Sequence, residues 1–250
     1  MNTEYQNNKE IYPEPSRRVW VVAADMGYGH QRTAYPLRDL AFSGKVINAN
    51  SYDGIPEKDK RFWHKTKSLY EFISRFKRIP LVGNMIFSFF DKFQRILIYY
   101  PKRDLSRPDF NIKIIFSFIK KRWGEDLISR FKKNPLPLIS TFFTPAFMAE
   151  YFQYPNDIYC VVCDADIARA WASLDPPKSK IKYFVPCTWV RDRLKLYGVN
   201  PQNIFLTGYP LPKENIGEDM EILKEDLKNR IINLDPKQNY RQLYKPLIQG

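Results

Sequence analysis

The chain has 250 residues, of which 44% are hydrophobic and 27% charged, and its formal net charge is +13. This is the composition of an ordinary globular protein, and it excludes disordered, collagen-like and fibrous classes. No run of about 18 uncharged apolar residues predicts a membrane-spanning helix, and three cysteines, an odd count, predict a chain of the reducing cytoplasm rather than a disulfide framework.

The N-terminal part predicts one βαβ unit. Residues 1–16 form a polar tail without the apolar core of a signal peptide. Residues 18–24 (RVWVVAA) are an uninterrupted β-branched and aromatic run, typical of a parallel strand buried on both faces. The glycine-rich loop 25–30 follows, then apolar residues with helical spacing up to Ala41, and then a second strand over 45–50.

A basic, aromatic-rich helical segment spans residues 58–133. It holds 20 Lys or Arg against 7 Asp or Glu, whereas the rest of the chain has 20 of each, so the whole charge excess lies here. Apolar residues spaced by three and four predict helices over Arg61–Phe76, Leu81–Tyr100 and Ile112–Phe131. Such a basic and aromatic region indicates a polyanionic partner, either anionic lipid head groups or nucleic acid. The alternative is a solvated charged face on ordinary helices.

After Pro135 strands and helices alternate again. Helices are predicted over 145–152 and 190–197, and strands over 136–141, 157–163, 181–186 and 204–207. Six short strands interleaved with helices predict an α/β fold, a Rossmann-like doubly wound parallel sheet over residues 17–212 with the basic segment inserted in it. We expect residues 213–250, which are charged and mainly helical, to form a linker or hinge helix.

The loop Gly27-Tyr28-Gly29-His30 is the strongest candidate for a binding site, because α/β folds place ligands at the carboxyl ends of strands. Its glycines allow close approach to the backbone. It is not a dinucleotide fingerprint, since Arg32 stands where the third glycine of G-x-G-x-x-G would fall. His30 can accept a proton from a substrate hydroxyl. The alternative is a helix-capping or loop histidine.

Two carboxylates, Asp164 and Asp166, follow the strand that ends at Cys163. At that position carboxylates can bind sugar hydroxyls or orient a base, and the alternative is that they cap the next helix. Cys160 and Cys163 are three residues apart, but no second Cys or His pair supports a zinc site, so we expect two core cysteines and no metal. His64, among lysines on a helix, is expected on the surface.

An ordered set of motifs resembles a known enzyme family. The motifs are Asp25-Met-Gly-Tyr-Gly-His30-Gln-Arg32-Thr-Ala34, Val161-Val-Cys-Asp164, Trp171, Tyr183-Phe-Val-Pro186 and Ile204-Phe-Leu-Thr-Gly208-Tyr-Pro210. The set resembles the N-terminal half of two-domain GT-B glycosyltransferases. It is similar to monogalactosyldiacylglycerol synthases and to the lipid-linked N-acetylglucosaminyltransferase of peptidoglycan synthesis. The similarity runs from about Arg18 to Pro210, without the helical segment between.

The resemblance implies roles for individual residues. His30 would be the catalytic base that faces the acceptor hydroxyl, and Asp164 would orient it or bind the acceptor. Two departures from the family are Cys163 in place of a threonine and Arg169 near the position of a histidine of the galactolipid synthases. The family's donor, a nucleotide-sugar and here expected to be UDP-linked, is held mainly by a second domain, which nothing after Pro210 resembles. The substrate-binding residues expected are Gly27, Tyr28, Gly29, Arg32, Asp166, Arg169 and Trp171.

The basic segment fits a membrane role. In the related enzymes the first domain touches the membrane where the lipid acceptor enters. Phenylalanines crowd residues 81–100 too densely for one buried stripe, and such a helix can lie in the interface with its cations on head groups. The alternative is a helix sandwiched between the sheet and other helices. The residues expected to face the membrane are Phe87, Phe90, Lys92 and Arg95.

The sequence therefore predicts the acceptor-binding domain of a membrane-associated glycosyltransferase, cytoplasmic and peripheral on the inner face of the cell membrane. It would move a hexose from a nucleotide-sugar to a lipid or lipid-linked hydroxyl without a cofactor, and only together with a C-terminal donor-binding domain. Two alternatives stay open. One is a non-catalytic binding module that keeps the fold, and the other is a nucleic-acid-binding protein, although no RNA or DNA motif is recognisable.

Overall fold

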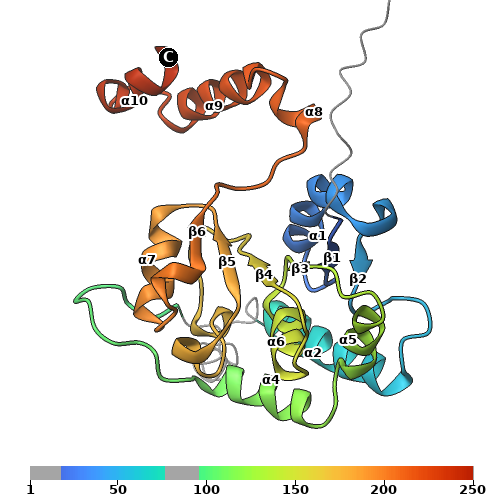
Figure 1. Ribbon diagram of the computed structural model, residues 1–250. Coiled ribbons are helices and arrows are strands. Elements are labelled where there is room, and N and C mark those ends of the chain that lie inside the picture. The colour runs from blue at the N-terminus through green and yellow to red at the C-terminus, as the bar shows by residue number, and fades with distance from the viewer. Residues whose placement is uncertain (1–17, 77–95, 250) are drawn as a thin grey trace, which may run out of the picture. The chain divides into compact units, whose positions relative to one another are not determined.

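Six parallel strands form one sheet in the order β2-β1-β3-β4-β5-β6 (Figure 1). The computed structural model describes residues 18–76 and 96–249. Every neighbouring pair of strands is parallel, so the predicted Rossmann-like α/β fold is confirmed, with each strand shorter than expected. The strands are β1 Trp20–Ala23, β2 Ile47–Asn48, β3 Leu138–Ser140, β4 Ile158–Val161, β5 Lys182–Val185 and β6 Ile204–Leu206.

Helices cover both faces because the chain leaves β1 toward one edge of the sheet and leaves β3 toward the other. Helix α1 and the 3₁₀ helix behind it pack on β1, whereas α6 packs on β3 and β4 and is itself covered by α4 and α5. Among the described residues up to Tyr209, the α-helices are α1 Tyr28–Ala34, α2 Glu57–Phe76, α4 Phe110–Lys120, α5 Glu125–Lys132, α6 Phe143–Tyr151 and α7 Thr188–Leu196.

The two faces of β1 belong to two separate cores. Successive strand residues point to opposite faces, so Val21 and Ala23 pack with Ala34 and Ala41 beneath α1, whereas Val22 joins the large core on the other face. Burial on both faces explains why the strand is apolar throughout. Members of the large core that are fully buried include Trp123, Ile128, Leu138, Phe147 and Tyr183.

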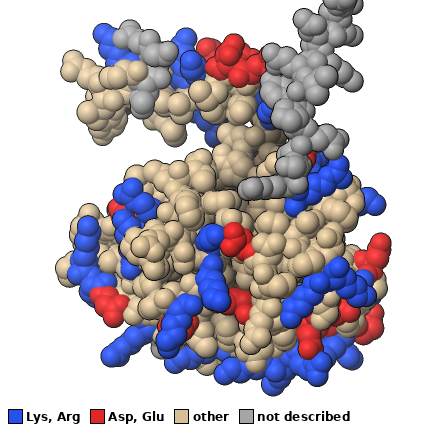
Figure 2. Space-filling view, viewed as in Figure 1, with Lys and Arg blue, Asp and Glu red and all other residues tan. Residues whose placement is uncertain are grey.

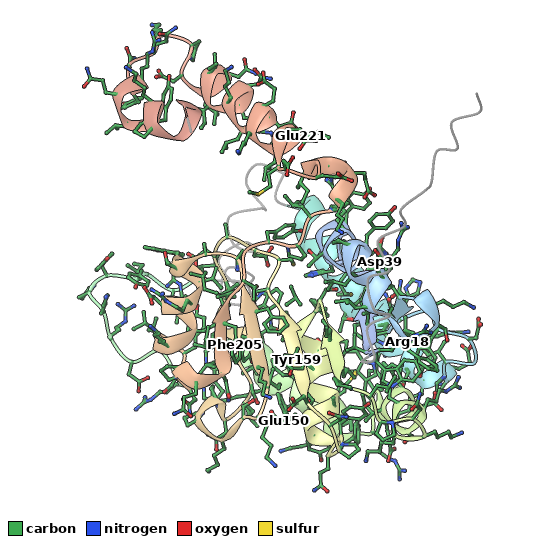
Figure 3. The ribbon with its side chains drawn as sticks, turned by 45° about the horizontal axis from the view of Figure 1, so that its top comes forward. Arg18, Asp39, Glu150, Tyr159, Phe205 and Glu221 are labelled. Carbon is green, nitrogen blue, oxygen red and sulfur yellow. The ribbon has the colours of Figure 1, made fainter. Side chains whose placement is uncertain are left out.

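Aromatic side chains connect the strands on the other half of the sheet. Tyr159 of β4 stacks on Phe184 of β5 with ring centroids 5.0 Å apart, and Phe184 meets Phe205 of β6 edge-on at 5.9 Å. Figure 3 shows Tyr159 and Phe205 on their strands. Cross-strand aromatic pairs of this kind each stabilise a sheet by roughly 0.2–1 kcal/mol.

The single helix predicted over residues 112–131 is wrong, because the chain breaks it into α4 and α5. The break has left-handed backbone at Arg122 (φ 69°) and at Gly124 (φ 83°). A Cβ atom at Gly124 would lie 2.1 Å from the sulfur of Met148, so only glycine lets α5 approach α6 this closely. The buried carboxylate of Asp59 accepts a hydrogen bond from the Gly124 amide at 3.1 Å and fixes the turn.

Two further helices differ from the prediction. Helix α1 begins inside the glycine loop at Tyr28 and continues as a 3₁₀ helix over Tyr35–Leu40, in whose first turn Pro36 has no amide to donate. Residues 96–100, predicted as the end of a helix, have no helical structure. The polar tail and the rest of that helix, with Phe87, Phe90, Lys92 and Arg95, lie outside the described residues.

The chain divides into a first unit that ends at Tyr209 and a second unit over Pro210–Gly250. The second unit consists of α8 Lys213–Ile216, α9 Glu221–Leu234 and α10 Arg241–Gln249. Its helices α9 and α10 are joined through the Asp235 carboxylate, which accepts hydrogen bonds from the amides of Asn239 and Tyr240 at 2.8 Å. Within the described part of the chain, no helix is both long and apolar enough to cross a membrane.

Candidate functional site

The candidate site lies where the strand order reverses. Strands β1 and β3 are neighbours, and the chain turns to opposite sides after them. In open α/β sheets ligands bind at the carboxyl ends of the strands at this switch point. The glycine loop follows β1 there, and Thr141 and Phe142 follow β3.

The imidazole of His30 joins these two loops. Its Nδ1 lies 3.0 Å from the carbonyl oxygen of Thr141, and the Thr141 hydroxyl donates to the carbonyl of His30 at 2.9 Å. The ring packs edge-on against Phe142, with centroids 4.7 Å apart, and lies 6.1 Å from the ring of Trp171. His30 is therefore held from both sides, with its ring against an aromatic wall.

The Thr141 contact determines which nitrogen of His30 carries the proton. A carbonyl oxygen only accepts hydrogen bonds, so Nδ1 must donate, and in the neutral ring Nε2 then has the lone pair. Burial lowers the pKa of His30 below its ordinary 6.5, against smaller raising effects from the Thr141 carbonyl and from Asp164. The ring is therefore neutral at pH 7, and its Nε2 can accept a proton.

Asp164 acts on His30 through charge. The residue is exposed at the end of β4, and its negative charge raises the pKa of His30. Partial desolvation raises the pKa of the Asp164 carboxyl itself, and His30 opposes that shift. A carboxylate in this position stabilises the imidazolium that forms when His30 takes up a proton.

Cys163 touches the histidine and packs at the margin of the large core, so it is only partly the core cysteine that we predicted. Its sulfur lies 3.0 Å from Nδ1 of His30, and the residue is half-buried beyond the end of β4. Burial raises the pKa of the thiol to about 12, so at pH 7 the sulfur is neutral and is not a nucleophile. Cys160, by contrast, is fully buried in the large core, as predicted.

The exposed part of the site is the glycine loop. Gly27 has a φ of 155°, and an added Cβ at Gly29 would meet nothing within 4 Å, so the loop surface is uncrowded. Tyr28 is 73% exposed, and the guanidinium of Arg32 lies over its ring, 5.5 Å from the centroid. This pair presents an aromatic face and a cation beside His30 in sequence, a combination suited to sugar or head-group contacts.

Two residues predicted to bind substrate, Arg169 and Trp171, have other contacts. Arg169 is 1% exposed, and its guanidinium donates to the carbonyls of Ser106, Ala172 and Ser173 at 2.7–3.0 Å. The buried ring of Trp171 packs on Phe143 at 5.2 Å. Both side chains are buried instead of facing solvent, and Trp171 forms part of the wall near His30, a difference that their sequence positions do not reveal.

Asp166 is likewise engaged inside the fold. Its carboxylate forms two hydrogen bonds with Arg193, at 2.9 and 2.7 Å, and Arg193 also donates to the carbonyl of Leu97 at 2.5 Å. Partial burial raises the pKa of Asp166, but hydrogen bonds from Arg193 and Trp189 outweigh that effect and lower it. This ion pair fastens α7 and the segment around Leu97 to the end of β4.

The sequence analysis did not single out Asn50, Lys67, Thr33 or Tyr209, although all four support the loop. The amide of Asp25 donates to the Asn50 side chain at 3.0 Å, and Lys67 pairs with the Asp25 carboxylate at 2.6 Å. Thr33 bonds both Gly29 and Tyr209. Only the strand-end position of Asn50 could have indicated such a role, because, apart from Gly29 and Thr33, the partners are far apart in sequence.

Metal chemistry has no obvious ligand set in the described residues, which contain no group of three or more His, Cys, Asp or Glu arranged to hold an ion. His64 is on the surface, as predicted.

Comparisons with protein-family models, curated proteins and solved structures find no match for this chain.

Proposed function

We propose that the first unit is the acceptor-binding domain of a glycosyltransferase that moves a sugar from a UDP-linked donor to a lipid or lipid-linked hydroxyl. The observation that carries the proposal is the state of His30, a neutral imidazole at the switch point with its Nε2 lone pair available. The resemblance of the motif order to GT-B enzymes implies the same role, with this histidine facing the acceptor hydroxyl.

In the proposed reaction Nε2 of His30 takes the proton of the acceptor hydroxyl as its oxygen bonds to the anomeric carbon of the sugar. The bond from that carbon to the UDP oxygen breaks, and UDP leaves with the electron pair. The Thr141 carbonyl keeps Nδ1 protonated and the ring oriented, and the charge of Asp164 stabilises the imidazolium. Tyr28 and Arg32 would contact the acceptor.

A membrane surface as partner is supported by the described part of the basic segment. Figure 2 shows Lys and Arg gathered at the lower rim of the view, where Figure 1 places α4. Ile96, Ile98 and Tyr100 are 44%, 61% and 63% exposed, on the stretch that follows the predicted membrane-facing residues. Exposed apolar side chains and cations within the same basic segment suit an anionic bilayer, here on the inner face of the cell membrane. The exposed cations at α4 are Lys113, Lys120, Lys121 and Arg122.

Photolabelling tests acceptor binding directly. A diacylglycerol with a diazirine beside its free hydroxyl, in phosphatidylglycerol vesicles, should label residues 25–32 on irradiation. Excess diacylglycerol or a polyprenyl-diphosphate-linked sugar should suppress the label, whereas triacylglycerol, which has no free hydroxyl, should not. Labelling that no hydroxyl-bearing lipid suppresses would overturn the proposal. If hydroxyl-bearing lipids suppress the label but Nε2 of His30 has no free lone pair, the non-catalytic binding module would be favoured.

Salt dependence separates the membrane from nucleic acid. Each Lys near an anionic bilayer contributes about 1 kcal/mol, so replacing Lys113, Lys120 and Lys121 with Gln should weaken vesicle binding about 100-fold. Wild-type binding should be only partly reversed by salt, because apolar contacts remain, whereas phosphate-driven nucleic-acid binding falls steeply. Sedimentation with vesicles and a duplex-retention assay measure both. Duplex binding without vesicle binding at any salt would contradict the membrane role.

A further inference from the structure

Thr33 connects the end of the first unit to the glycine loop. Its side chain on α1 is fully buried, and its hydroxyl oxygen lies 2.8 Å from the Gly29 carbonyl and 2.7 Å from the Tyr209 hydroxyl. The carbonyl can only accept, and the Thr33 hydroxyl has a single hydrogen, which therefore points to Gly29. The remaining bond must be donated by Tyr209. The direction of both bonds is thus fixed, from Tyr209 to Thr33 to Gly29.

The backbone around Tyr209 directs its ring to this position. Gly208 has a left-handed φ of 81°, with open space where a Cβ would be, so the chain turns there without strain. Pro210 restricts Tyr209 to an extended conformation. These neighbours limit the ways in which the Tyr209 hydroxyl can reach α1, 176 residues away in sequence.

A backbone route leads from Thr33 to His30. The Gly29 carbonyl belongs to the peptide group whose nitrogen is that of His30, so fixing this oxygen fixes the plane from which the His30 side chain starts. The histidine is thus held by Thr141 at its ring and by the bond from Thr33 to Gly29 at its backbone.

We infer that Tyr209 is a positioning residue for His30, and that its hydroxyl acts through Thr33 and the Gly29–His30 peptide. The inference rests on the proposed function in that it takes His30 as the acting base. Because Tyr209 is the last residue of the first unit, a displacement of the chain at Pro210 that withdraws the ring also releases the glycine loop.

The test uses the two histidines of the chain, which give two sets of imidazole signals in NMR, assigned with a His64→Gln variant. In Tyr209→Phe the ring stays and the hydroxyl is lost, so the loop loosens, water reaches His30, and its titration midpoint rises toward 6.5. Thr33→Val should give the same rise, and adding Tyr209→Phe to it should give no more. Thr33→Ser keeps a hydroxyl and should restore the wild-type midpoint.

The control is Tyr159→Phe, which also loses a tyrosine hydroxyl, one bonded to Asp157 away from the site. It should leave His30 unchanged, and His64 should be unchanged in every other variant. A wild-type His30 midpoint in both Tyr209→Phe and Thr33→Val would overturn the inference. A shift in Thr33→Ser equal to that in Thr33→Val would overturn it as well, since packing and not the hydroxyl would then matter. Failure of the proposed function would appear elsewhere, as photolabelling that hydroxyl-bearing lipids do not suppress.

Discussion

The polar side chains at the carboxyl edge of the sheet are used in two opposite ways. On the arginine side, Asp166, Arg169 and Arg193 bond to one another or to backbone carbonyls inside the fold. On the histidine side, which comprises Gly27–His30 and Asp164, the loop is exposed and His30 is bonded through only one of its ring nitrogens in the contacts described above. The first set stabilises the fold, and the second is available for a ligand.

This difference shows what decides the role of a polar residue at a strand end. Asp164 and Asp166 are two residues apart, and both follow β4. One is exposed near His30, and the other forms a two-point bond with an arginine that is 2% exposed. Position along the strand brings both to the edge, but the arrangement of partners from distant segments assigns the roles.

The largest loss of stability is expected for a substitution on the arginine side. In Arg169→Met the side-chain length stays, but the carbonyls of Ser106, Ala172 and Ser173 lose their donor. The last two are buried, and each unsatisfied buried group costs about 1–3 kcal/mol. The free energy of unfolding should fall by about 3–5 kcal/mol in urea titrations. Arg32→Met, on the histidine side, is the matched control and should change it by less than about 0.5 kcal/mol. Equal losses of unfolding free energy in both variants would contradict the difference between the arginine side and the histidine side.

The second prediction compares the neighbouring carboxylates. Asp166→Asn leaves the buried guanidinium of Arg193 without its counter-charge, so unfolding free energy should fall by about 2–3 kcal/mol. Asp164→Asn should cost less than about 0.5 kcal/mol, because that side chain is exposed. Chemical denaturation of the two single variants measures both values. A larger loss of unfolding free energy in Asp164→Asn than in Asp166→Asn would contradict the assignment of Asp166 to the side that stabilises the fold.

Much of the fold could be predicted because its signals are local. The run from Val19 to Ala24 is apolar throughout since β1 is buried on both faces, and the glycine loop marks the strand's end. The break between α4 and α5 could not be predicted in the same way. It depends on Met148 from another helix, which leaves room only for a glycine at position 124.

The site could be predicted in part. His30 and Asp164 were singled out because the fold class brings strand ends together, and they do influence each other. The burial of Arg169 and the contact of Cys163 with His30 depend on side-chain packing between segments far apart in the chain. Tyr209 stood inside the Gly208-Tyr-Pro210 motif, but its contact with Thr33 could not be predicted, because the two residues are remote in sequence.

A change of pH is expected to have a smaller effect on the free energy of unfolding. The pKa of His30 is below 6.5 in the folded chain, so just under that pH the unfolded chain binds more protons. The free energy of unfolding should therefore fall as the pH drops below about 6.5, by less than about 1.4 kcal/mol per pH unit, and level off below the folded pKa. His30→Gln should remove this slope, and His64→Gln should keep it. A slope retained in His30→Gln would assign it to another group.

The protonation state of His30 tests the central claim most directly. Long-range ¹H–¹⁵N NMR of the chain with ¹⁵N-labelled histidine, recorded at pH 7.5, distinguishes the two ring nitrogens of each imidazole. The Thr141 contact predicts a neutral His30 with its proton on Nδ1 and a lone pair on Nε2. A proton on Nε2, or a charged ring at this pH, would leave no acceptor for the hydroxyl proton and would contradict the assignment of His30 as the base.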